Sequence, residues 1–331
     1  MNHLHKLVFL LFLTLALSCG RYTANESQNL PGYQSAVATP SWYDPGAIDT
    51  LSVVTWNVEH FVDGYDNPYI DNGREDNPPK DMSERRVLLA EAIRKLDADI
   101  IVFQELESDS YLQAFAEEYF PEMGYEVFAA LESPDWYMNV VMMSRVPMGV
   151  FYSYAHVSTP ILGQTNDEGE PASQAFTNNR MWTADMLVNE HYSLTLTGLH
   201  LKAGGGERNQ AWRLGQIALL RDHLGMLMRE NAGRNMLVLG DLNTTPGSKE
   251  FNELLGDEPP LFIDPLAGTG AYSHPSDSLF WRIDHMLPNR QLQKELVPQS
   301  VEVIEPLSRE QMIQISDHLP IIARFVTEEQ E

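Results

Sequence analysis

An acidic and an amide side chain stand close together in the stretch Met236 to Pro246, M-L-V-L-G-D-L-N-T-T-P. Met236 to Leu239 is a short apolar run, which predicts a strand buried on both faces that ends at Gly240. Asp241 and Asn243 follow one residue apart, so an extended backbone would point both side chains the same way. Such a pair can bind a hard cation or a phosphoryl oxygen. The alternative is an Asx turn that only closes the strand.

Three more polar side chains stand where predicted strands end. The run Leu51 to Asn57 alternates and is rich in β-branched residues, which predicts a strand that carries Asn57 to its carboxyl end. The apolar run Asp99 to Gln104 ends in Glu105, and a later strand ends in His200. A lone histidine is more often a capping or packed residue than a catalyst, so each residue taken singly has a structural explanation.

The C-terminal part adds acids and a histidine. The run Phe280 to Met286 predicts a strand that carries Asp284, and Gln314 to Phe325 predicts a turn with Asp317 and His318 before a last strand. Neighbouring side chains on an extended backbone point apart, so an Asp-His pair such as Asp284 and His318 has to be assembled across the fold. A histidine with a near-neutral pKa suits a general base, and a carboxylate behind it fixes its tautomer.

Hydrophobic periodicity predicts the elements that position these residues. An apolar residue recurs every three or four positions in Ser83 to Leu96 and in Arg208 to Met228, which predicts two amphipathic helices. The first helix lies between two predicted strands and completes a βαβ-like unit. Other predicted elements are strands at Tyr125 to Ala130, Met138 to Ser144, Pro147 to Val157, Met181 to Val188 and Tyr192 to Leu199, helices at Tyr111 to Phe120 and Lys249 to Leu255, and polar loops at Val62 to Lys80 and Ser158 to Asn179.

The composition is strongly acidic. The chain has 331 residues, with 22 Lys and Arg against 47 Asp and Glu and a formal net charge of -25. This charge opposes any broad electrostatic attraction to a nucleic acid or an anionic membrane, so cations have to mediate the binding of a polyanionic substrate. Solubility in a salty medium is another reason for such acidity. The length suits about two domains or one large two-sheet fold.

The N-terminus predicts export and a lipid anchor. Residues 1–18 place Lys6 ahead of an apolar run from Leu7 to Leu17, which is too short to span a membrane and is typical of a signal peptide. The only cysteine, Cys19, follows in L-A-L-S-C-G, which resembles a bacterial lipoprotein lipobox. Ala16 stands where that pattern has leucine, so ordinary cleavage stays an alternative. We expect a bacterial cell-envelope protein anchored in the membrane by lipid on Cys19, or otherwise a periplasmic or secreted one.

Residues 19–49 are polar with three prolines and predict a tether, whereas residues 50–327 hold the periodic elements. Six motifs of that domain, taken in order, resemble the endonuclease/exonuclease/phosphatase superfamily of the deoxyribonuclease-like fold, in a bacterial exported member. The resemblance covers Leu51 to Phe325 and implies a four-layer α/β sandwich, with two mixed β-sheets packed face to face, helices outside and the site at one rim. The motifs are W-N-V-E at Trp56 to Glu59, Q-E-L-E at Gln104 to Glu107, G-L-H at Gly198 to His200, G-D-L-N at Gly240 to Asn243, R-I-D-H at Arg282 to His285, and S-D-H at Ser316 to His318.

The resemblance also implies a metal site. Glu105 corresponds to the principal Mg²⁺ ligand, with Asn57 and Asp317 as further ligands. Mg²⁺ suits a site with few carboxylates because it takes oxygen ligands and keeps several waters. Mg²⁺ is therefore the implied cofactor, with Mn²⁺ or Ca²⁺ as alternatives.

The catalytic roles that the resemblance implies fall on five residues. Asp241 and Asn243 correspond to the pair that positions and polarises the nucleophilic water and the phosphate. His318 corresponds to the general base or a phosphate-contacting imidazole, oriented by Asp284. His200 corresponds to a second histidine that helps the leaving oxygen depart or stabilises the pentacovalent charge. Attack of water on a phosphodiester needs these functions.

Departures from named branches narrow the substrate. Thr244 to Pro246 stand where inositol polyphosphate 5-phosphatases carry a basic residue, and Q-E-L-E replaces the Q-E-T-K of AP endonucleases. One cysteine cannot form the internal disulfide of secreted pancreatic-type deoxyribonucleases. The stretch His200 to Ala211 resembles bacterial extracellular nucleases and phosphodiesterases instead. A nuclease is therefore the leading hypothesis, with nucleic acid as the partner and a basic rim at Arg145, Arg180, Lys202 and Arg208.

Two alternatives remain. A phospholipid (sphingomyelinase-like) or small-molecule phosphodiesterase would use the same site, with Phe280 and Trp281 as conceivable membrane contacts, although we expect these aromatics to be buried. A non-catalytic surface binding module would be expected to lack at least one charged site residue, and none is missing. The sequence implies no protein partner.

Overall fold

The computed structural model describes residues 39–46, 48–65, 70, 73–133 and 136–328. All described residues belong to the unit Thr39–Glu331. The predicted signal peptide, Cys19 and most of the predicted tether lie outside the described residues. Within these ranges, no helix is both long and apolar enough to cross a membrane.

Strands and helices alternate along the described chain. The first half holds β1 (Thr50–Phe61), α2 (Gly73–Asp76), α3 (Met82–Leu96), β2 (Ile100–Leu106), α4 (Asp109–Tyr119), η1 (Pro121–Met123), β3 (Val127–Ala130), β4 (Asn139–Ser144), β5 (Met148–Ser153), β6 (Thr159–Thr165) and β7 (Pro171–Gln174). The second half holds η2 (Asn178–Arg180), β8 (Met181–Leu187), β9 (Ser193–His200), α5 (Glu207–Glu230), β10 (Asn235–Asp241), α6 (Lys249–Leu255), β11 (Asp284–Pro288), η3 (Leu292–Lys294), β12 (Glu302–Val303), α7 (Arg309–Ile315) and β13 (Ile321–Val326).

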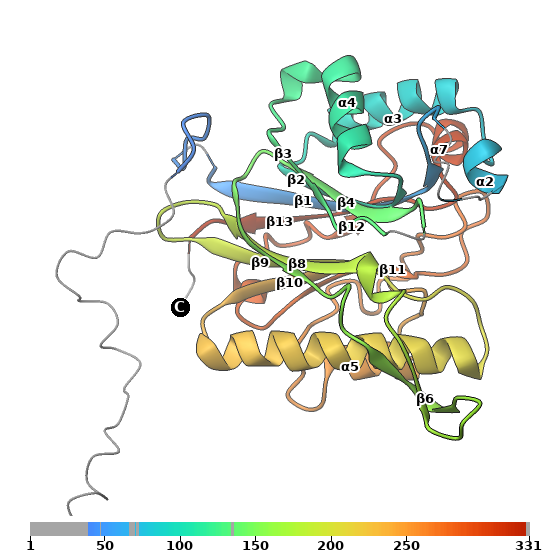
Figure 1. Ribbon diagram of the computed structural model, residues 1–331. Coiled ribbons are helices and arrows are strands. Elements are labelled where there is room, and N and C mark those ends of the chain that lie inside the picture. The colour runs from blue at the N-terminus through green and yellow to red at the C-terminus, as the bar shows by residue number, and fades with distance from the viewer. Residues whose placement is uncertain (1–38, 47, 66–69, 71–72, 134–135, 329–331) are drawn as a thin grey trace, which may run out of the picture. The chain divides into compact units, whose positions relative to one another are not determined.

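Two mixed β-sheets pack face to face between layers of helices. In the described part of the chain, six strands form the first sheet in the order β12-β13-β1-β2-β4-β3, and five form the second in the order β11-β10-β9-β8-β5. Figure 1 shows α3, α4 and α7 on the outer side of the first sheet and α5 on the outer side of the second. The four-layer α/β sandwich that the resemblance implied is therefore confirmed.

Alternation along the strands explains why the sheets are buried on both faces. In β1, Val54 and Trp56 pack against α3, α4 and α7, whereas Leu51 and Val53 pack against the second sheet. A third apolar cluster joins the other face of the second sheet to α5 and α6. Apolar layers thus lie between the sheets and beneath both sets of helices.

Each sheet contains one parallel pair whose strands are linked through a helix. β1 and β2 are parallel with α3 between them in sequence, and β9 and β10 are parallel with α5 between them. Parallel strands bring their carboxyl ends to the same edge of a sheet. Asn57 pairs with Gln104 at that edge in the first sheet, and His200 pairs with Asp241 in the second. The βαβ-like unit predicted from the sequence is confirmed.

Three local predictions were wrong, one of them the loop predicted over Val62 to Lys80, which contains α2. The loop predicted over Ser158 to Asn179 contains the antiparallel pair β6 and β7. β6 packs on α5 at a close backbone approach, where a Cβ on Gly215 would lie 2.2 Å from the carbonyl oxygen of Pro160. The strand predicted over Phe280 to Met286 begins only at Asp284, and α7 was not predicted.

Candidate active site

Three polar side chains form a row across the second sheet. Asp241, the last residue of β10, pairs in register with His200 on β9 and with Asp284 on β11. All three are buried. Gly240 permits this arrangement, because its φ is 133° and a Cβ there would lie 1.9 Å from the carbonyl oxygen of Leu199. The close backbone approach before Asp241 therefore fixes the position of that acid.

Asn57 and Glu105 of the first sheet face this row. Nδ2 of Asn57 donates to Oδ2 of Asp241 at 3.0 Å and lies 3.4 Å from Oε1 of Glu105. Nε2 of His200 lies 3.6 Å from Asp241 and 3.8 Å from Glu105. One amide and one imidazole therefore join carboxylates that come from the two different sheets.

Glu105 occupies an irregular part of β2. Its φ of 59° is left-handed, and the pairing of β2 with β4 shifts register at this residue. β1 is irregular at the same edge, where Glu59 and His60 have φ values of 45° and 49°. Bulges re-aim side chains, and strained backbone collects at functional sites. Here the irregularity lets the backbone N–H of His60 donate to Oε2 of Glu105 at 3.2 Å.

His318 and Asp284 form the Asp-His pair that we expected the fold to bring together. Nδ1 of His318 lies 2.8 Å from Oδ2 of Asp284, and the hydroxyl of Ser273 donates to the same oxygen at 2.6 Å. Trp56 Nε1 donates to the carbonyl of His318 at 3.0 Å, which ties the turn that carries His318 to β1. This hydrogen bond therefore joins the W-N-V-E motif to the S-D-H motif.

Two expectations about side-chain direction were wrong. Asn243 is not extended but has a φ of 49°, and its backbone N–H donates to Oδ1 of Asp241 at 2.8 Å. The Asx turn and the candidate site therefore coexist at Asp241. Asp317 and His318 lie in a bend rather than an extended segment, which brings Oδ1 of Asp317 to 3.7 Å from Nε2 of His318.

Burial controls the protonation of the two acids that face each other. Burial raises the pKa of Asp241 to about 7, with the charge of Asp284 adding to the rise and that of His318 opposing it. Burial also raises the pKa of Glu105. Ionisation of either carboxylate is therefore unfavourable unless a further cation compensates its charge.

The two histidines carry opposite shifts. Burial and then the charge of Arg180 lower the pKa of His200 well below its usual value, so its ring is neutral. Burial also opposes the charged form of His318, but Asp284 outweighs it and, with Asp241, raises the pKa of His318 to about 10. His318 is an imidazolium at neutral pH in the metal-free protein. This charge state favours phosphate contact over the general-base role.

The acids fit a hard divalent cation, which prefers carboxylate oxygens. Glu105 and Asp241 present oxygens on either side of the Asn57 amide, and a cation there would compensate their buried charge. Oδ1 of Asn57 accepts from the backbone N–H of Glu59 at 3.0 Å, so in this arrangement Asn57 orients the acids. Direct ligation by Asn57 stays a prediction.

Asp317 groups with a residue that sequence reasoning missed. One ligand atom each from His274, Asp317 and His318 all lie within 4.8 Å of one another. No motif contains His274, and its place beside Asp317 depends on a loop whose path the sequence does not give. Metal binding by Asp317 together with Glu105 stays a prediction.

Two further residues that support the site were missed. Nε2 of His60 lies 3.6 Å from Oε2 of Glu105, and its position directly after W-N-V-E was the available signal. Arg85 on α3 is buried and donates to the carbonyl of Glu59 at 2.6 Å and to that of Ile315 at 3.0 Å. Arg85 thereby holds the bulged end of β1 beside the end of α7.

Three of the four predicted substrate-binding cations lie next to strands of the second sheet. Lys202 and Arg208 follow β9 in the sequence, and Arg180 directly precedes β8. Lys202 and Arg208 both stand over the ring of Trp212, at 5.4 Å and 5.1 Å from its centroid. Arg180 stands over Trp136 at 5.3 Å. These aromatic platforms hold the cations in place, and nucleotide contact by them stays a prediction.

Arg145 is the exception, because the structure does not bring it to the site. It follows β4, which runs antiparallel to β2, and its backbone N–H donates to the carbonyl of Asp99 at 2.9 Å. Glu105 lies at the other end of β2, about 20 Å away along the strand. The Arg145 side chain instead pairs with Asp97 at 2.6 Å and covers Tyr125.

An open cleft of about 490 Å³ gives access to these residues. Phe280 and Trp281 are 65% and 47% exposed, so the expectation that both are buried was wrong. Trp281 lines the cleft. The lining residues are Glu105, His200, Ala203, Gly204, Gly205, Arg213, Asp241, Asn243, Thr244, Thr245, His274, Trp281, Ile283 and His318.

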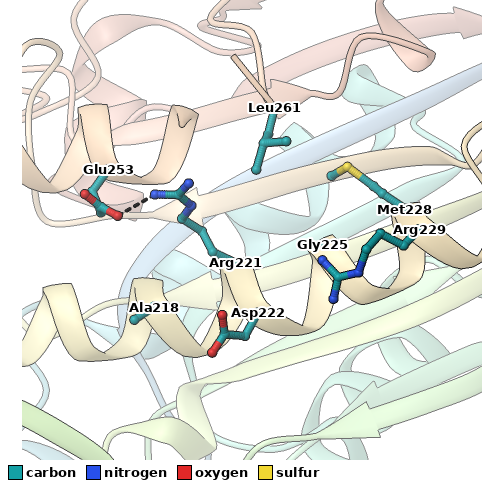
Figure 2. Close-up of a pocket in the computed structure, with 8 residues that line it drawn as sticks. All are labelled: Ala218, Arg221, Asp222, Gly225, Met228, Arg229, Glu253 and Leu261. Carbon is teal, nitrogen blue, oxygen red and sulfur yellow. Dashed lines mark hydrogen bonds and ion pairs between the residues drawn. The ribbon is translucent and has the colours of Figure 1, made fainter. Parts of the chain in front are cut away.

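A second hollow of about 510 Å³ lies along α5 beside α6 (Figure 2). Figure 2 shows Arg221 of α5 paired with Glu253 of α6, and Arg229 further along α5. Its lining contains no histidine, and Glu253 is already paired. The cleft at the sheet edge is therefore the stronger candidate for an active site.

Comparisons with known proteins agree with this fold. The chain matches the model of the Endonuclease/Exonuclease/phosphatase family over residues 54–318, and no curated protein matches it. An endonuclease/exonuclease/phosphatase from Beutenbergia cavernae DSM 12333 has a TM-score of 0.55 and 19% identity, covering 84% of this chain and 72% of that one. Truncated Caenorhabditis elegans TDP2 has a TM-score of 0.55 and 15% identity, covering 84% and 98%.

The human Nocturnin catalytic domain with bound sulfate anion has a TM-score of 0.54 and 18% identity, covering 84% of this chain and 94% of that one. Identities this low show a shared fold. The family match spans most of the two-sheet domain and includes the motifs that build the cleft. This chain therefore belongs to the endonuclease/exonuclease/phosphatase family.

Proposed function

We propose that this protein is an exported, metal-dependent phosphodiester hydrolase, and that it is a nuclease that cleaves DNA or RNA by in-line attack of water. The observation that carries the proposal is the meeting of Glu105 and Asp241, from different sheets, around Asn57 and beside the Asp284–His318 pair. An open cleft exposes this cluster to a substrate. The family consists of hydrolytic phosphoesterases, which supports the reaction class.

The protein groups divide the chemistry according to their charge. Asp241 and Asn243, linked through the backbone N–H of Asn243, are suited to position and polarise the attacking water. His318 is cationic and suited to bind a non-bridging phosphate oxygen, while Asp284 holds its Nδ1. A bound Mg²⁺ would supply charge neutralisation at the phosphate, with Mn²⁺ or Ca²⁺ as alternatives.

Nucleic acid is the proposed substrate because basic side chains lie near the cleft of a protein that is otherwise acidic. Lys202 and Arg208 follow β9 closely, and Lys202 and Arg180 both act on the pKa of His200. A chain with a formal charge of -25 cannot gather DNA by bulk attraction, so these local cations and the bound metal would contact only a few phosphates.

A phospholipid phosphodiesterase is the second candidate, and one observation favours it. Phe280 and Trp281 are exposed beside the cleft, where they could enter the headgroup region of a membrane. The same aromatic rings could stack on nucleobases, so this observation does not displace the first candidate.

Substrate panels test the proposal. The purified protein with Mg²⁺, Mn²⁺ or Ca²⁺ is incubated with DNA, RNA, sphingomyelin vesicles and a chromogenic phosphodiester, alongside His318→Ala. We expect cleavage of DNA or RNA by the native protein and at least about a 10²-fold loss in the variant, the order expected when one group that stabilises transition-state charge is removed. Cleavage of sphingomyelin or the small diester alone would transfer the assignment to the second candidate. Inertness toward all four would reject the hydrolase.

A further inference from the structure

Three side chains at the mouth of the cleft are arranged like ligands around a common centre. Nε2 of His274 lies 3.6 Å from Oδ2 of Asp317, and Nε2 of His318 lies 3.7 Å from Oδ1 of Asp317. Both separations exceed a hydrogen bond. Ligand atoms about 2.1 Å from a tetrahedral Zn²⁺ stand roughly 3.4 Å apart. These two separations go to different oxygens of Asp317, and one ligand atom from each of the three residues lies within 4.8 Å of the others, so small side-chain rotations would bring them to the separation of ligands that share one cation.

His318 is already held in the orientation that metal-binding histidines adopt. Asp284 engages its Nδ1 at 2.8 Å, which leaves Nε2 between Asp317, at 3.7 Å, and Asp241, at 4.0 Å. A carboxylate on the remote ring nitrogen fixes the tautomer and raises the basicity of a ligating imidazole. Ser273 in turn donates to Asp284 at 2.6 Å. The supporting interactions of a histidine ligand are present.

His274 is held in place, and the polar partner of its side chain among the described residues is Asp317. Its Nδ1 is buried without a hydrogen-bond partner, and its Nε2 faces Asp317. Its backbone pairs with Trp281 in an isolated bridge, and the two rings are parallel within 8°. A fixed imidazole whose Nε2 faces Asp317 is positioned to bind a cation together with that carboxylate.

We infer that His274, Asp317 and His318 form a site for a borderline transition-metal dication, with Zn²⁺ as the reference ion, separate from the Mg²⁺ site proposed at Glu105 and Asp241, which assigns Asp317 to this second site. Two imidazoles and one carboxylate favour Zn²⁺ over Mg²⁺, which prefers oxygen ligands. Asp317 is 42% exposed, so solvent can reach the site and supply the remaining ligand. The cation would be bound by Nε2 of His318.

Occupation of this site has a consequence for activity that rests on the proposed function. A cation on Nε2 of His318 blocks the ring nitrogen that is proposed to contact the phosphate in the cleft. Zn²⁺ should therefore inhibit hydrolysis in the presence of Mg²⁺. The binding itself does not depend on the proposed function and can be measured without any substrate.

Co²⁺ is the probe for binding, because its visible absorption reports a low-coordinate site with nitrogen ligands. The full chain is titrated with Co²⁺ under excess Mg²⁺, and the same titration is made on His274→Ala, His274→Gln and Glu105→Gln. His191→Ala is the matched control, since His191 is an exposed histidine at the β8–β9 turn. Circular dichroism confirms folding of each variant.

We expect one equivalent of Co²⁺ to give visible bands that Zn²⁺ abolishes and Mg²⁺ does not. Both His274 variants should bind Co²⁺ at least about 100-fold more weakly, while the control and Glu105→Gln keep the bands. Equal binding by either folded His274 variant, loss of the bands in Glu105→Gln, or displacement by Mg²⁺ would each overturn the separate site.

Inhibition is measured on the same proteins. Zn²⁺ should inhibit the native protein and His191→Ala at concentrations at least about 10-fold lower than those that inhibit His274→Gln, each relative to its own Zn²⁺-free rate. Equal inhibition would overturn the link to His318. If no protein hydrolyses any substrate, the proposed function fails, and the Co²⁺ titration still decides the metal site.

Discussion

His318 and Asp284 are in direct contact, with Nδ1 of the imidazole 2.8 Å from Oδ2 of the carboxylate. His318 follows α7 beside the first sheet, whereas Asp284 begins β11 of the second. The contact therefore spans the two sheets at the edge where Asn57 also meets Asp241. Any change that separates the sheet edges should disturb both pairs together.

Removing the carboxylate should change the charge of His318. The charge of Asp284 outweighs the effect of burial on His318, and Asp284→Asn removes that charge. The pKa of His318 should therefore fall from about 10. Hydrolysis should slow by about 10- to 100-fold, as for other lost partners of functional histidines. NMR titration of the imidazole and steady-state kinetics measure these effects. Ser273→Ala keeps the His318–Asp284 contact and should have the smaller effect on both, and equal effects would contradict the account.

Metal affinity should rise with pH. Burial, with the charge of Asp284, raises the pKa of Asp241 to about 7, so this acid is mostly protonated at pH 6 and mostly ionised at pH 8. A cation binds the ionised form, and its binding should release a proton and weaken by about 10-fold for each pH unit below 7. Calorimetry in buffers of different ionisation enthalpy measures the released proton. An affinity for Mg²⁺ that is unchanged from pH 8 to pH 6 would contradict this prediction.

Charge reversal at the start of α5 should weaken binding of long substrates. Arg208→Glu should raise the KM for DNA more than that for a small chromogenic diester, and the salt dependence of DNA cleavage should be shallow, with a log-log slope of roughly 2 to 4. Arg229→Glu is the matched control, because Arg229 is at the other end of the same helix, about 30 Å away. Equal effects of the two reversals would show that Arg208 acts only through net charge.

The lipid anchor is tested in cells. Cys19→Ser should move the protein from the membrane fraction to the soluble fraction and abolish lipid labelling, because a lipid on Cys19 is the proposed anchor. Fractionation and metabolic labelling measure the change. Unchanged partitioning of the variant would rule out Cys19 as the anchor.

The sequence was sufficient to predict the residues at the carboxyl ends of the parallel strands. Asn57, Glu105, His200 and Asp241 each follow an apolar run, and parallel pairing brings such residues to one edge whatever the details of packing. The G-D-L-N motif contains Asp241, which contacts Asn57, and the S-D-H motif contains His318, which contacts Asp284.

Strand order and loop paths account for what the sequence could not predict. Arg145 also ends a strand, but β4 is antiparallel to β2, so Arg145 lies at the edge opposite Glu105. The approach of His274 to Asp317 depends on a long loop with no periodic pattern. The bulge at Glu105 is a local backbone irregularity that composition does not reveal.

The most direct test of the central claim compares the native protein with Glu105→Gln in the hydrolysis of a chromogenic phosphodiester, with Mg²⁺ and with excess chelator. The substitution keeps the size of the side chain and removes the negative charge proposed to hold the metal. We predict that chelator abolishes hydrolysis by the native protein, that Mg²⁺ restores it, and that the folded variant is inactive under both conditions. Full native activity in chelator, or near-native activity of Glu105→Gln, would contradict a metal-dependent site at Glu105.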